Sequence, residues 1–333
     1  MKTKILTLGE ILLRLSTPKQ NQLIDSSKLN MTIGGSETNV AISLANLGYS
    51  VSVLTVLPKN EFGKLATRVL RQNNVETSAI QYLDGRMGVY FLEDGVGIRK
   101  SKVIYDRANS AFARSEISFE SLQAIFEDVS LFHISGITPA LSPFWFDATI
   151  FLAEYAHKKG IPVSLDVNYR SKLWTTDRCR EFVQKIAPFL TFCSAGSRDA
   201  ATFFDVDCHT YPTLSEQYEQ IVRKFPTIQY LFSTKRTVFD ATHNKLKGYL
   251  YERGQLFESD EYDLTNIVDR VGGGDSFFAG VLFGCLEDMG AFDAIQFGTC
   301  LSAMKHTIYG DWQSFSKEDI LSEIHQKNRE IQR

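Results

Sequence analysis

Two kinds of hydrophobic pattern alternate along most of the chain. Short apolar runs predict buried strands at residues 5–8, 51–56, 131–135, 162–167, 191–193 and 230–232. Apolar positions at helical spacing predict helices at residues 36–47, 61–72, 143–157, 197–204, 216–224, 291–307 and 317–327. Because strands and helices follow one another in turn, the pattern predicts an α/β fold with a doubly wound, mostly parallel sheet flanked by helices.

Two segments break this alternation. Residues 12–33 combine β-prone positions with Pro18 and a polar middle, which indicates that this segment leaves the main sheet. Residues 88–113 hold two β-rich runs separated by Glu93-Asp94-Gly95, which predicts a hairpin. We expect the two segments to form a small β-sheet lid. The main domain is then expected to comprise residues 1–11, 34–87 and 114–333.

The composition is that of an ordinary globular protein. A chain of 333 residues is long for one compact core, so one large domain with an appendage, or two domains, is expected. The hydrophobic fraction is 44% and the charged fraction 23%, both unremarkable for a soluble protein. The net charge of -3 gives no reason to expect nucleic acid or an acidic membrane surface as a partner. Small-molecule chemistry is therefore the default expectation.

The cysteines and the N-terminal residues point away from secretion. The 5 cysteines are widely spaced and never form a Cys-x-x-Cys pair, so neither a zinc site nor a disulfide framework is indicated. The apolar run in residues 1–10 is too short for a signal peptide, and no apolar stretch approaches the length of a membrane span. We expect a cytoplasmic protein with no membrane partner.

Candidate chemistry concentrates in residues 269–280, which read Asp-Arg-Val-Gly-Gly-Gly-Asp-Ser-Phe-Phe-Ala-Gly. Gly272, Gly273 and Gly274 precede an apolar run at helical spacing, which indicates a glycine turn entering a helix. The N–H groups of such a terminus stabilise an anion without Lys or Arg. Asp275 could then accept the proton of a hydroxyl attacking a bound phosphoryl group. A plain glycine loop, with Asp275 stabilising the first helical turn, explains the same residues.

A second glycine turn enters the helix predicted at residues 36–47. It reads Gly34-Gly35-Ser36-Glu37-Thr38-Asn39, and Ser36 is a suitable N-cap. An ordinary well-capped loop explains this turn at least as well as a function does.

Polar residues also follow the strand predicted at residues 162–167. Open α/β sheets bind ligands at the carboxyl ends of strands, and alternation would place Asp166, Asn168 and Arg170 on one side if the strand continues. A structural salt bridge is the alternative. Arg107 lies on the predicted hairpin, where an arginine is usually just solvated. Together, Arg107 and Arg170 would suit a substrate with a carboxylate, which a guanidinium binds through two parallel hydrogen bonds.

The two glycine turns resemble the two signatures of the ribokinase-type (PfkB) carbohydrate kinases, in the family's order. The resemblance implies a ribokinase-like fold whose lid excludes water from phosphoryl transfer. It implies that Asp275 is the catalytic base and that the amides of Gly272, Gly273 and Gly274 form an anion hole for the migrating phosphate. The implied cofactors are ATP and Mg²⁺, and a requirement for a monovalent cation is left open.

Within that family, three further runs resemble the 2-keto-3-deoxygluconate kinases: Tyr-Asp-Arg at 105–107, Asp-Val-Asn-Tyr-Arg at 166–170 and residues 304–311. The resemblance covers essentially the whole chain. It implies ATP-dependent phosphorylation of the terminal primary hydroxyl of that sugar acid. The implied substrate-binding residues are Gly34, Gly35, Asn39, Tyr90, Tyr105, Arg107, Asn168, Arg170 and Asp275.

The nucleotide side matches the family pattern less well. The candidate nucleotide-binding residues are Ser233, Thr234, Lys235, Arg236, Gly272, Gly274, Ala303 and His306. Lys235 and Arg236 could equally be solvated, and His306 could serve packing alone. Many family members carry Asn-x-x-Glu, which helps to organise magnesium and phosphate, where this chain has Gly196-Ser197-Arg198-Asp199. Asp199 could still replace the glutamate and act on the metal largely through water.

Two alternative functions stay open at this point. One is a kinase for fructose or another related sugar. The other is a catalytically weak sugar-acid binding or regulatory protein on the same fold, which the altered segment at Gly196 motivates. Exposed β-edges in residues 12–33 and 88–107 would permit a homo-oligomer that pairs through the lid.

Overall fold

The main sheet runs through the centre of the molecule. The computed structural model describes residues 4–325. The strand order is β14-β13-β12-β11-β10-β9-β1-β4-β5, with β15 beside β13 and β6 beside β4. These strands are β1 (Lys4–Leu8), β4 (Ser50–Pro58), β5 (Val75–Glu76), β6 (Ile80–Leu83), β9 (Leu131–Ser135), β10 (Val163–Asp166), β11 (Phe192–Ser194), β12 (Tyr230–Val238), β13 (Asn244–Glu252), β14 (Gln255–Glu258) and β15 (Tyr262–Leu264). Strands from β4 to β12 pair in parallel, and β13 pairs antiparallel with β12, β14 and β15. The predicted doubly wound, mostly parallel sheet is confirmed.

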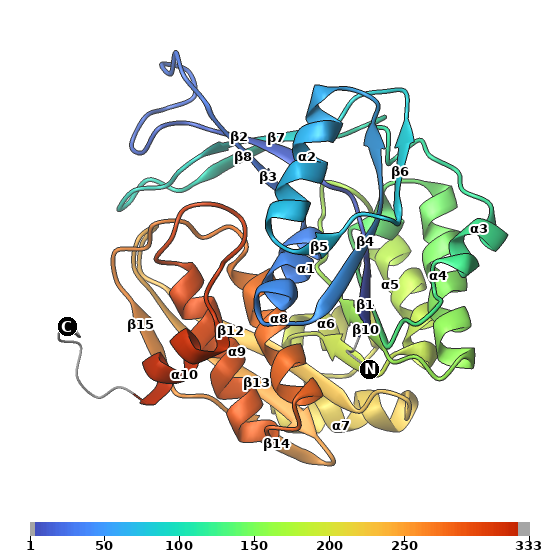
Figure 1. Cartoon of the computed structure of the whole chain (residues 1–333). Coiled ribbons are helices and arrows are strands. Elements are labelled where there is room, and N and C mark those ends of the chain that lie inside the picture. Colours follow the sequence, from blue (N-terminus) through green and yellow to red (C-terminus); the bar gives the residue numbers. More distant parts are fainter. Residues whose placement is uncertain (1–3, 326–333) are drawn as a thin grey trace.

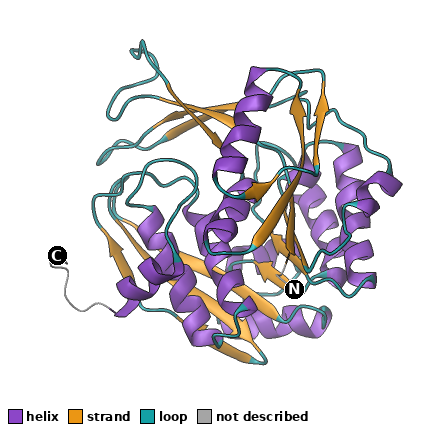
Figure 2. Cartoon of the chain, viewed as in Figure 1, coloured by secondary structure: helices purple, strands orange, loops and turns teal. Residues whose placement is uncertain are grey.

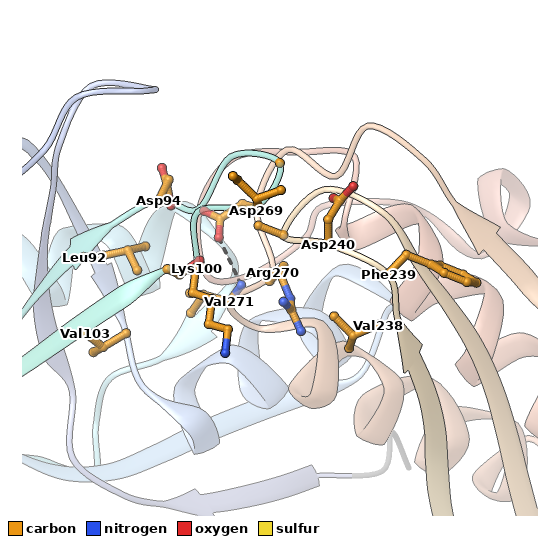
Figure 3. A pocket seen from close by; sticks show the side chains of 14 residues that line it. Leu92, Asp94, Lys100, Val103, Val238, Phe239, Asp240, Asp269, Arg270 and Val271 are labelled. Atoms are coloured by element: carbon orange, nitrogen blue, oxygen red, sulfur yellow. Dashed lines mark hydrogen bonds between the residues drawn. The ribbon is translucent and has the colours of Figure 1, made fainter.

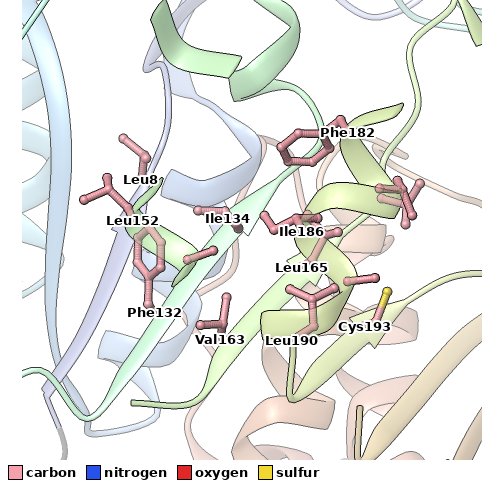
Figure 4. Packing of buried hydrophobic residues seen from close by; sticks show 14 of the residues in the cluster. Leu8, Phe132, Ile134, Leu152, Val163, Leu165, Phe182, Ile186, Leu190 and Cys193 are labelled. Atoms are coloured by element: carbon pink, nitrogen blue, oxygen red, sulfur yellow. The ribbon is translucent and has the colours of Figure 1, made fainter. Parts of the chain in front are cut away.

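Helices cover both faces of this sheet (Figures 1 and 2). They are α1 (Ser36–Asn46), α2 (Glu61–Gln72), α3 (Phe119–Ala124), α4 (Pro143–Lys158), α5 (Thr176–Ile186), α6 (Ser197–Phe203), α7 (Leu214–Lys224), α8 (Gly273–Leu286), α9 (Ala291–Lys305) and α10 (Lys317–His325). One hydrophobic core joins the sheet to α3–α7, and a second core on the other face joins it to α1, α2 and α8–α10. Figure 4 shows the first of these cores, where Phe132 and Val163 from the sheet lie beside Leu152 from α4.

The predicted elements agree with the observed ones where the apolar pattern is strong. The helix at 61–72 and the strand at 131–135 have the predicted bounds. The pattern did not predict α3, α5, β5, β6 or the antiparallel edge from β13 to β15. Alternate residues of β13 are only partly buried, so no continuous apolar run marks that strand. Residues 326 and 327, the end of the helix predicted at 317–327, lie outside the described residues.

A second, four-stranded sheet lies beside the main body, at the upper left of Figure 1. Its order is β3-β2-β7-β8, with β2 (Leu12–Ser16), β3 (Asn30–Gly34), β7 (Gly88–Glu93) and β8 (Lys102–Asp106). The predicted hairpin is β7 and β8, although residues 94–101 connect the strands instead of a tight turn. Phe112 already belongs to the main body, because its ring stacks on Trp145 at 4.5 Å. The division into lid and main domain stays a prediction.

The direction of winding places the site. Strand β1 lies between β4 and β9, so the chain first adds strands on one side of β1 and then on the other. Ligands of such sheets bind where the winding reverses, outside the carboxyl ends of the strands. Here Glu10 follows β1, Gly136 follows β9 and Asp166 ends β10. Within residues 4–325, no helix is both long and apolar enough to cross a membrane.

Candidate active site

The two glycine turns lie close together. Asp275 belongs to the first turn of α8, and its carboxylate contacts the first turn of α1. Ser36 Oγ donates a hydrogen bond of 3.0 Å to Oδ1 of Asp275, and Asn39 Nδ2 donates one of 2.7 Å to Oδ2. Asn168 Nδ2 donates to Ser36 Oγ at 2.9 Å, which leaves the Ser36 hydrogen free to point at Asp275. Each carboxylate oxygen of Asp275 therefore has one fixed donor, and the orientation of the carboxylate is set.

The surroundings of Asp275 make it more basic than an ordinary aspartate. Burial raises the pKa of Asp275 to about 6, although the hydrogen bonds from Asn39 and Ser36 and the charge of Arg170 lower it. A carboxyl group with this pKa is mostly ionised at neutral pH and still accepts a proton readily. These are the properties required of a general base.

The glycine turn before Asp275 presents free backbone donors. Gly272 is the N-cap of α8 in the left-handed conformation, with φ 79°. Gly273, Gly274 and Asp275 form the first turn of the helix. Among residues 4–325, no acceptor is hydrogen-bonded to the N–H of Gly274 or of Asp275. Two open amides at a helix N-terminus are able to bind an anion, and the anion hole itself stays a prediction.

The first glycine turn differs from the prediction in its cap. Gly35, with φ 148°, is the N-cap of α1, and Ser36 is the first helical residue. A Cβ on Gly35 would lie 2.6 Å from the carbonyl oxygen of Glu10, so only glycine fits there. Because Gly35 provides the cap, the hydroxyl of Ser36 is available to bind Asp275 instead.

A cavity of about 420 Å³, here called the sugar-side cavity, opens in front of Asp275, Gly272 and Gly274. Most of the predicted substrate-binding residues line it, namely Gly35, Asn39, Tyr90, Tyr105, Arg107, Asn168 and Arg170. Gly34 does not line it, and neither does Gly273, which was predicted for the anion hole. Gly34 is packed against the carboxylate of Asp311, and Gly273 against the ring of His306. These two glycines make room for protein side chains.

The two arginines predicted to bind a carboxylate have different electrostatic surroundings. Arg107 is buried, and its Nε donates to Glu10 Oε2 at 2.8 Å, so its charge is compensated within the protein. Arg170 is exposed and donates only to the carbonyl of Tyr169, at 3.4 Å. In the described part of the chain, no carboxylate lies within 4.0 Å of Arg170. Arg170 is therefore available to an anionic ligand.

The alternation argument required strand β10 to continue through Arg170. The strand ends at Asp166 instead. Asn168 has φ 39°, so the chain turns there. The turn, and not strand alternation, brings Asp166, Asn168 and Arg170 to the same cavity. Burial, together with the nearby charge of Asp275, raises the pKa of Asp166 to about 8.

The segment expected to hold nucleotide lies within a strand. Residues 233–236 belong to β12, which pairs with β13 as far as Val238 and is longer than the predicted strand. Ser233 is buried and accepts a hydrogen bond of 2.8 Å from the hydroxyl of Tyr218. Thr234 is partly exposed and Lys235 exposed, and neither lines the sugar-side cavity, whereas Arg236 does.

Arg236 faces a residue that the sequence did not suggest, Arg270. Arg236 is exposed at the surface, and partial desolvation by the surrounding protein, followed by the nearby charge of Arg270, lowers its pKa. Neither arginine has a carboxylate within 4.0 Å among the described residues. Two unpaired arginines beside the Gly272–Gly274 amides suit a polyphosphate, because guanidinium groups bind phosphate oxygens through parallel hydrogen bonds.

Arg270 also borders a second cavity, of about 630 Å³, between the β7–β8 connection and the turn after β12 (Figure 3). Lys100 and Phe239 line this cavity from the two sides. Because Val103, Arg270 and Val271 line both cavities, the second cavity lies next to the sugar-side cavity.

Ala303 and His306 lie elsewhere, in a cavity of about 790 Å³ that shares no lining residue with the sugar-side cavity. His306 is buried, and its Nδ1 donates to the carbonyl of Ser302 at 2.6 Å. Burial lowers the pKa of His306 to about 4, so the ring is neutral at pH 7. Its ring packs against Gly273, where a Cβ would lie 2.4 Å from Cε1 of His306. A contact of either residue with nucleotide stays a prediction.

Asp199 caps its own helix. Its Oδ2 accepts a hydrogen bond of 2.9 Å from the N–H of Gly196, and Gly196 has no side chain to complete a reciprocal pair. Among residues 4–325, no group of three or more His, Cys, Asp or Glu residues is arranged to hold a metal ion. Asp199 lines none of the three cavities described above, and its contact to a metal through water stays a prediction.

The structure also brings residues to the site that sequence reasoning missed. Ser36 and Arg270 lie inside the glycine motifs, so their position was a usable signal. Asp311 lines the sugar-side cavity and packs against both Gly34 and Gly272. Asp311 ends the run at residues 304–311 that resembles the kinases, but the resemblance assigned it no role, because its neighbours come from distant parts of the chain.

Comparison with known proteins gives consistent matches. Residues 2–225 match the pfkB family carbohydrate kinases. A 2-dehydro-3-deoxygalactonokinase from Haloferax volcanii is 30% identical, and the alignment covers 96% of each chain. The solved structure of a PfkB family carbohydrate kinase from Listeria grayi is 36% identical, with a TM-score of 0.94, covering 97% of this chain and 100% of that one. The structure of a 2-dehydro-3-deoxygluconokinase from Thermotoga maritima is 33% identical, with a TM-score of 0.92 and the same coverage.

Proposed function

Because the chain belongs to the pfkB family of carbohydrate kinases, we propose that it transfers the γ-phosphoryl group of ATP to the terminal primary hydroxyl of 2-keto-3-deoxygluconate. The products are 2-keto-3-deoxy-6-phosphogluconate and ADP. One observation carries the proposal: a single cavity contains the oriented base Asp275, the open amides of the glycine turn and the unpaired Arg170. In this proposal the base and the amides take part in phosphoryl transfer, and Arg170 binds the carboxylate of the substrate.

In the proposed reaction, Asp275 removes the proton of the terminal hydroxyl as its oxygen bonds to the γ-phosphorus. The bond between that phosphorus and the β–γ bridging oxygen breaks, and ADP leaves with the bonding electrons. The N–H groups of Gly274 and Asp275 stabilise the negative charge on the phosphoryl oxygens. Ser36 and Asn39 keep the carboxylate of Asp275 aimed at the hydroxyl.

Arg236 and Arg270 are proposed to hold the polyphosphate beside the glycine turn, with Ser233, Thr234 and Lys235 nearby on β12. Mg²⁺ would be held through water by Asp199 and would neutralise phosphate charge when bound. A monovalent-cation requirement is tested by exchanging K⁺ for tetramethylammonium in the assay. The use of ATP and a sugar acid fits a cytoplasmic location, which is part of the proposal.

A homo-oligomer through the lid is also proposed. The small sheet exposes apolar side chains, with Met31 of β3 51% exposed and Ile104 of β8 56% exposed. Sedimentation of the wild type and of a Met31→Lys, Ile104→Lys variant tests this directly, since added charge should separate subunits that pair through this face.

A neutral sugar leaves Arg170 without a partner, which is why fructose is the weaker candidate. The Haloferax volcanii relative favours one further candidate, 2-keto-3-deoxygalactonate, which has the same carboxylate and terminal hydroxyl. The two acids differ in the configuration of one hydroxyl, so their discrimination depends on single contacts.

The decisive measurement is ADP release with ATP and Mg²⁺ on both keto acids, fructose, ribose and gluconate, with Asp275→Asn as the blank. We expect turnover to be highest on a 2-keto-3-deoxy acid. Turnover confined to fructose or another neutral sugar would refute the assigned substrate class. Calorimetric binding of the keto acid with no ADP release would support the binding-protein alternative.

A further inference from the structure

A completely buried arginine connects the small sheet to the candidate anion hole. Arg14 belongs to β2, and its side chain is 0% exposed. Nη2 lies 2.6 Å from Oδ2 of Asp269, and Nη1 donates to Oδ1 of Asp311 at 2.8 Å. The guanidinium also lies 4.8 Å from the ring centre of Tyr309. Arg14 therefore joins three segments that are distant in sequence.

Asp269 anchors the turn that contains the glycines. Its Oδ1 accepts a hydrogen bond of 3.0 Å from the N–H of Val271, marked by the dashed line in Figure 3. Its Oδ2 accepts one of 3.1 Å from the N–H of Gly310. The carboxylate thus fixes the backbone just before Gly272 and ties it to the segment after α9. Arg14 holds this carboxylate from the side of β2.

Asp311 lies between the two glycine turns. A Cβ on Gly272 would come within 1.6 Å of the carbonyl oxygen of Asp311, and a Cβ on Gly34 within 1.9 Å of its Oδ2. Tyr90 donates its hydroxyl hydrogen to the same Oδ2. A movement of Asp311 would therefore displace the anion-hole turn and the wall of the sugar-side cavity together.

We propose that Arg14 is a positioning residue, which fixes the anion-hole turn relative to the sugar-side wall by bridging Asp269 and Asp311. The proposal rests on the proposed phosphoryl transfer only for its kinetic consequence. Arg14 touches neither substrate nor reacting atoms, because it does not line the sugar-side cavity. It acts through the carboxylates of Asp269 and Asp311, since the third carboxylate nearby, that of Asp94, lies farther away at 3.9 Å.

The charges explain why this position requires an arginine. The side chains of Asp269 and Asp311 are 1% and 2% exposed, so water screens their repulsion poorly. Burial alone would lower the pKa of Arg14, but the charges of Asp269 and Asp311 raise it above the ordinary value, so Arg14 stays charged. A planar guanidinium reaches both carboxylates at once, whereas the single ammonium of a lysine is a point charge.

Three variants test the proposal: Arg14→Ala, the milder Arg14→Lys, and Arg86→Ala as the matched control. Arg86 is a partly exposed arginine beside the small sheet, with an ion pair of 2.8 Å to Asp106. We expect kcat of Arg14→Ala to fall by roughly 10–100-fold, the scale of a displacement of about 1 Å in a catalytic group. The kcat of Arg14→Lys should lie between those of Arg14→Ala and the wild type. The kcat of Arg86→Ala should equal that of the wild type.

Chemical rescue separates positioning from general loss of structure. Guanidinium ion at millimolar concentration should restore part of the kcat of Arg14→Ala, and tetramethylammonium should not. Amide hydrogen exchange should become faster at residues 269–275 in both Arg14 variants without ligand, while α2 keeps its wild-type rate. An unchanged kcat, or exchange rates at residues 269–275 equal to those of the wild type, would overturn the proposal.

The outcomes are distinct from those of the proposed function. If the wild type phosphorylates no sugar acid, the reaction is wrong, but exchange at residues 269–275 still decides the role of Arg14. If Arg14→Ala does not fold, Arg14→Lys provides the same exchange and kinetic readouts. Loss of activity in Arg14→Lys with wild-type exchange at residues 269–275 would also reject positioning.

Discussion

Asn39 Nδ2 donates a hydrogen bond of 2.7 Å to Oδ2 of Asp275, across a separation of 236 residues in the sequence. This contact joins the first turn of α1 to the first turn of α8. It brings together two glycine motifs that have no local reason to meet. The amide also favours the ionised form of Asp275, which burial opposes.

Replacing Asp275 by Asn keeps the shape of the side chain and removes the base. We expect turnover to fall by roughly two to four orders of magnitude, the usual contribution of a positioned acid or base. Binding of the keto acid, measured by calorimetry, should change little. Near-normal turnover would show that another group accepts the proton.

The activity should depend on pH through Asp275. Its pKa is raised to about 6, so protonation below that pH removes the base, and kcat/KM should rise with pH through about 6. His306, with a pKa of about 4, and Asp166, with a pKa of about 8, titrate below and above this step. Asn39→Ala removes a hydrogen bond that stabilises the carboxylate, so it should move the step to higher pH. A step that stays in place in Asn39→Ala would contradict the assignment.

Arg170→Ala should weaken binding of the acid selectively. A hydrogen bond between charged groups contributes about 1.5–3 kcal/mol, so the apparent KM for the keto acid should rise by roughly 10-fold or more. Fructose, which has no carboxylate, provides the control in the same variant, and its KM should stay within about twofold of the wild type. An equal effect on both substrates would mean that Arg170 supports the cavity without recognising charge.

Two glycines of one turn should respond differently to alanine. Gly272 has φ 79°, and a Cβ there would meet the carbonyl of Asp311 at 1.6 Å, so Gly272→Ala should lower the melting temperature and abolish activity. A Cβ on Gly274 meets no protein atom within 4 Å, so Gly274→Ala should fold normally. It should still lose activity, because the methyl group projects into the space where phosphate is proposed to bind. Full activity of Gly274→Ala would argue against that anion site.

Gly196→Asn tests the departure from the family motif. A Cβ at Gly196 would meet only Asp199 Oδ2 at 3.8 Å and Ser233 Cβ at 3.9 Å, so a side chain fits. We expect Gly196→Asn to fold normally and to need less Mg²⁺ for half-maximal turnover, because the added amide can bind metal-bound water. Gly196→Ala is the control without an amide. Equal Mg²⁺ dependence in both variants would show that this segment does not contact the hydrated ion.

The sequence by itself determined the features that depend on neighbouring residues. Helical periodicity gave the bounds of α2, and a buried apolar run gave those of β9, because each pattern follows from the geometry of one element. The glycine turn at Gly272–Gly274 could also be recognised locally, since its conformation and the helix behind it are set by consecutive residues. The same segment also suggested Asp275 as the candidate base, because it lies next to the glycines in the sequence.

Only the tertiary structure decided which side chains meet across the chain. In the sequence, Arg14 is a single polar residue within a short β-prone run. In the structure it is buried between Asp269 and Asp311. Arg107 lies at the end of a hairpin strand, yet Glu10 compensates its charge, so that of the two arginines predicted to bind a carboxylate only Arg170 is without an ion pair among the described residues. Such partners are chosen by sheet winding and helix packing, and these depend on contacts distant in sequence that no local pattern of polarity records.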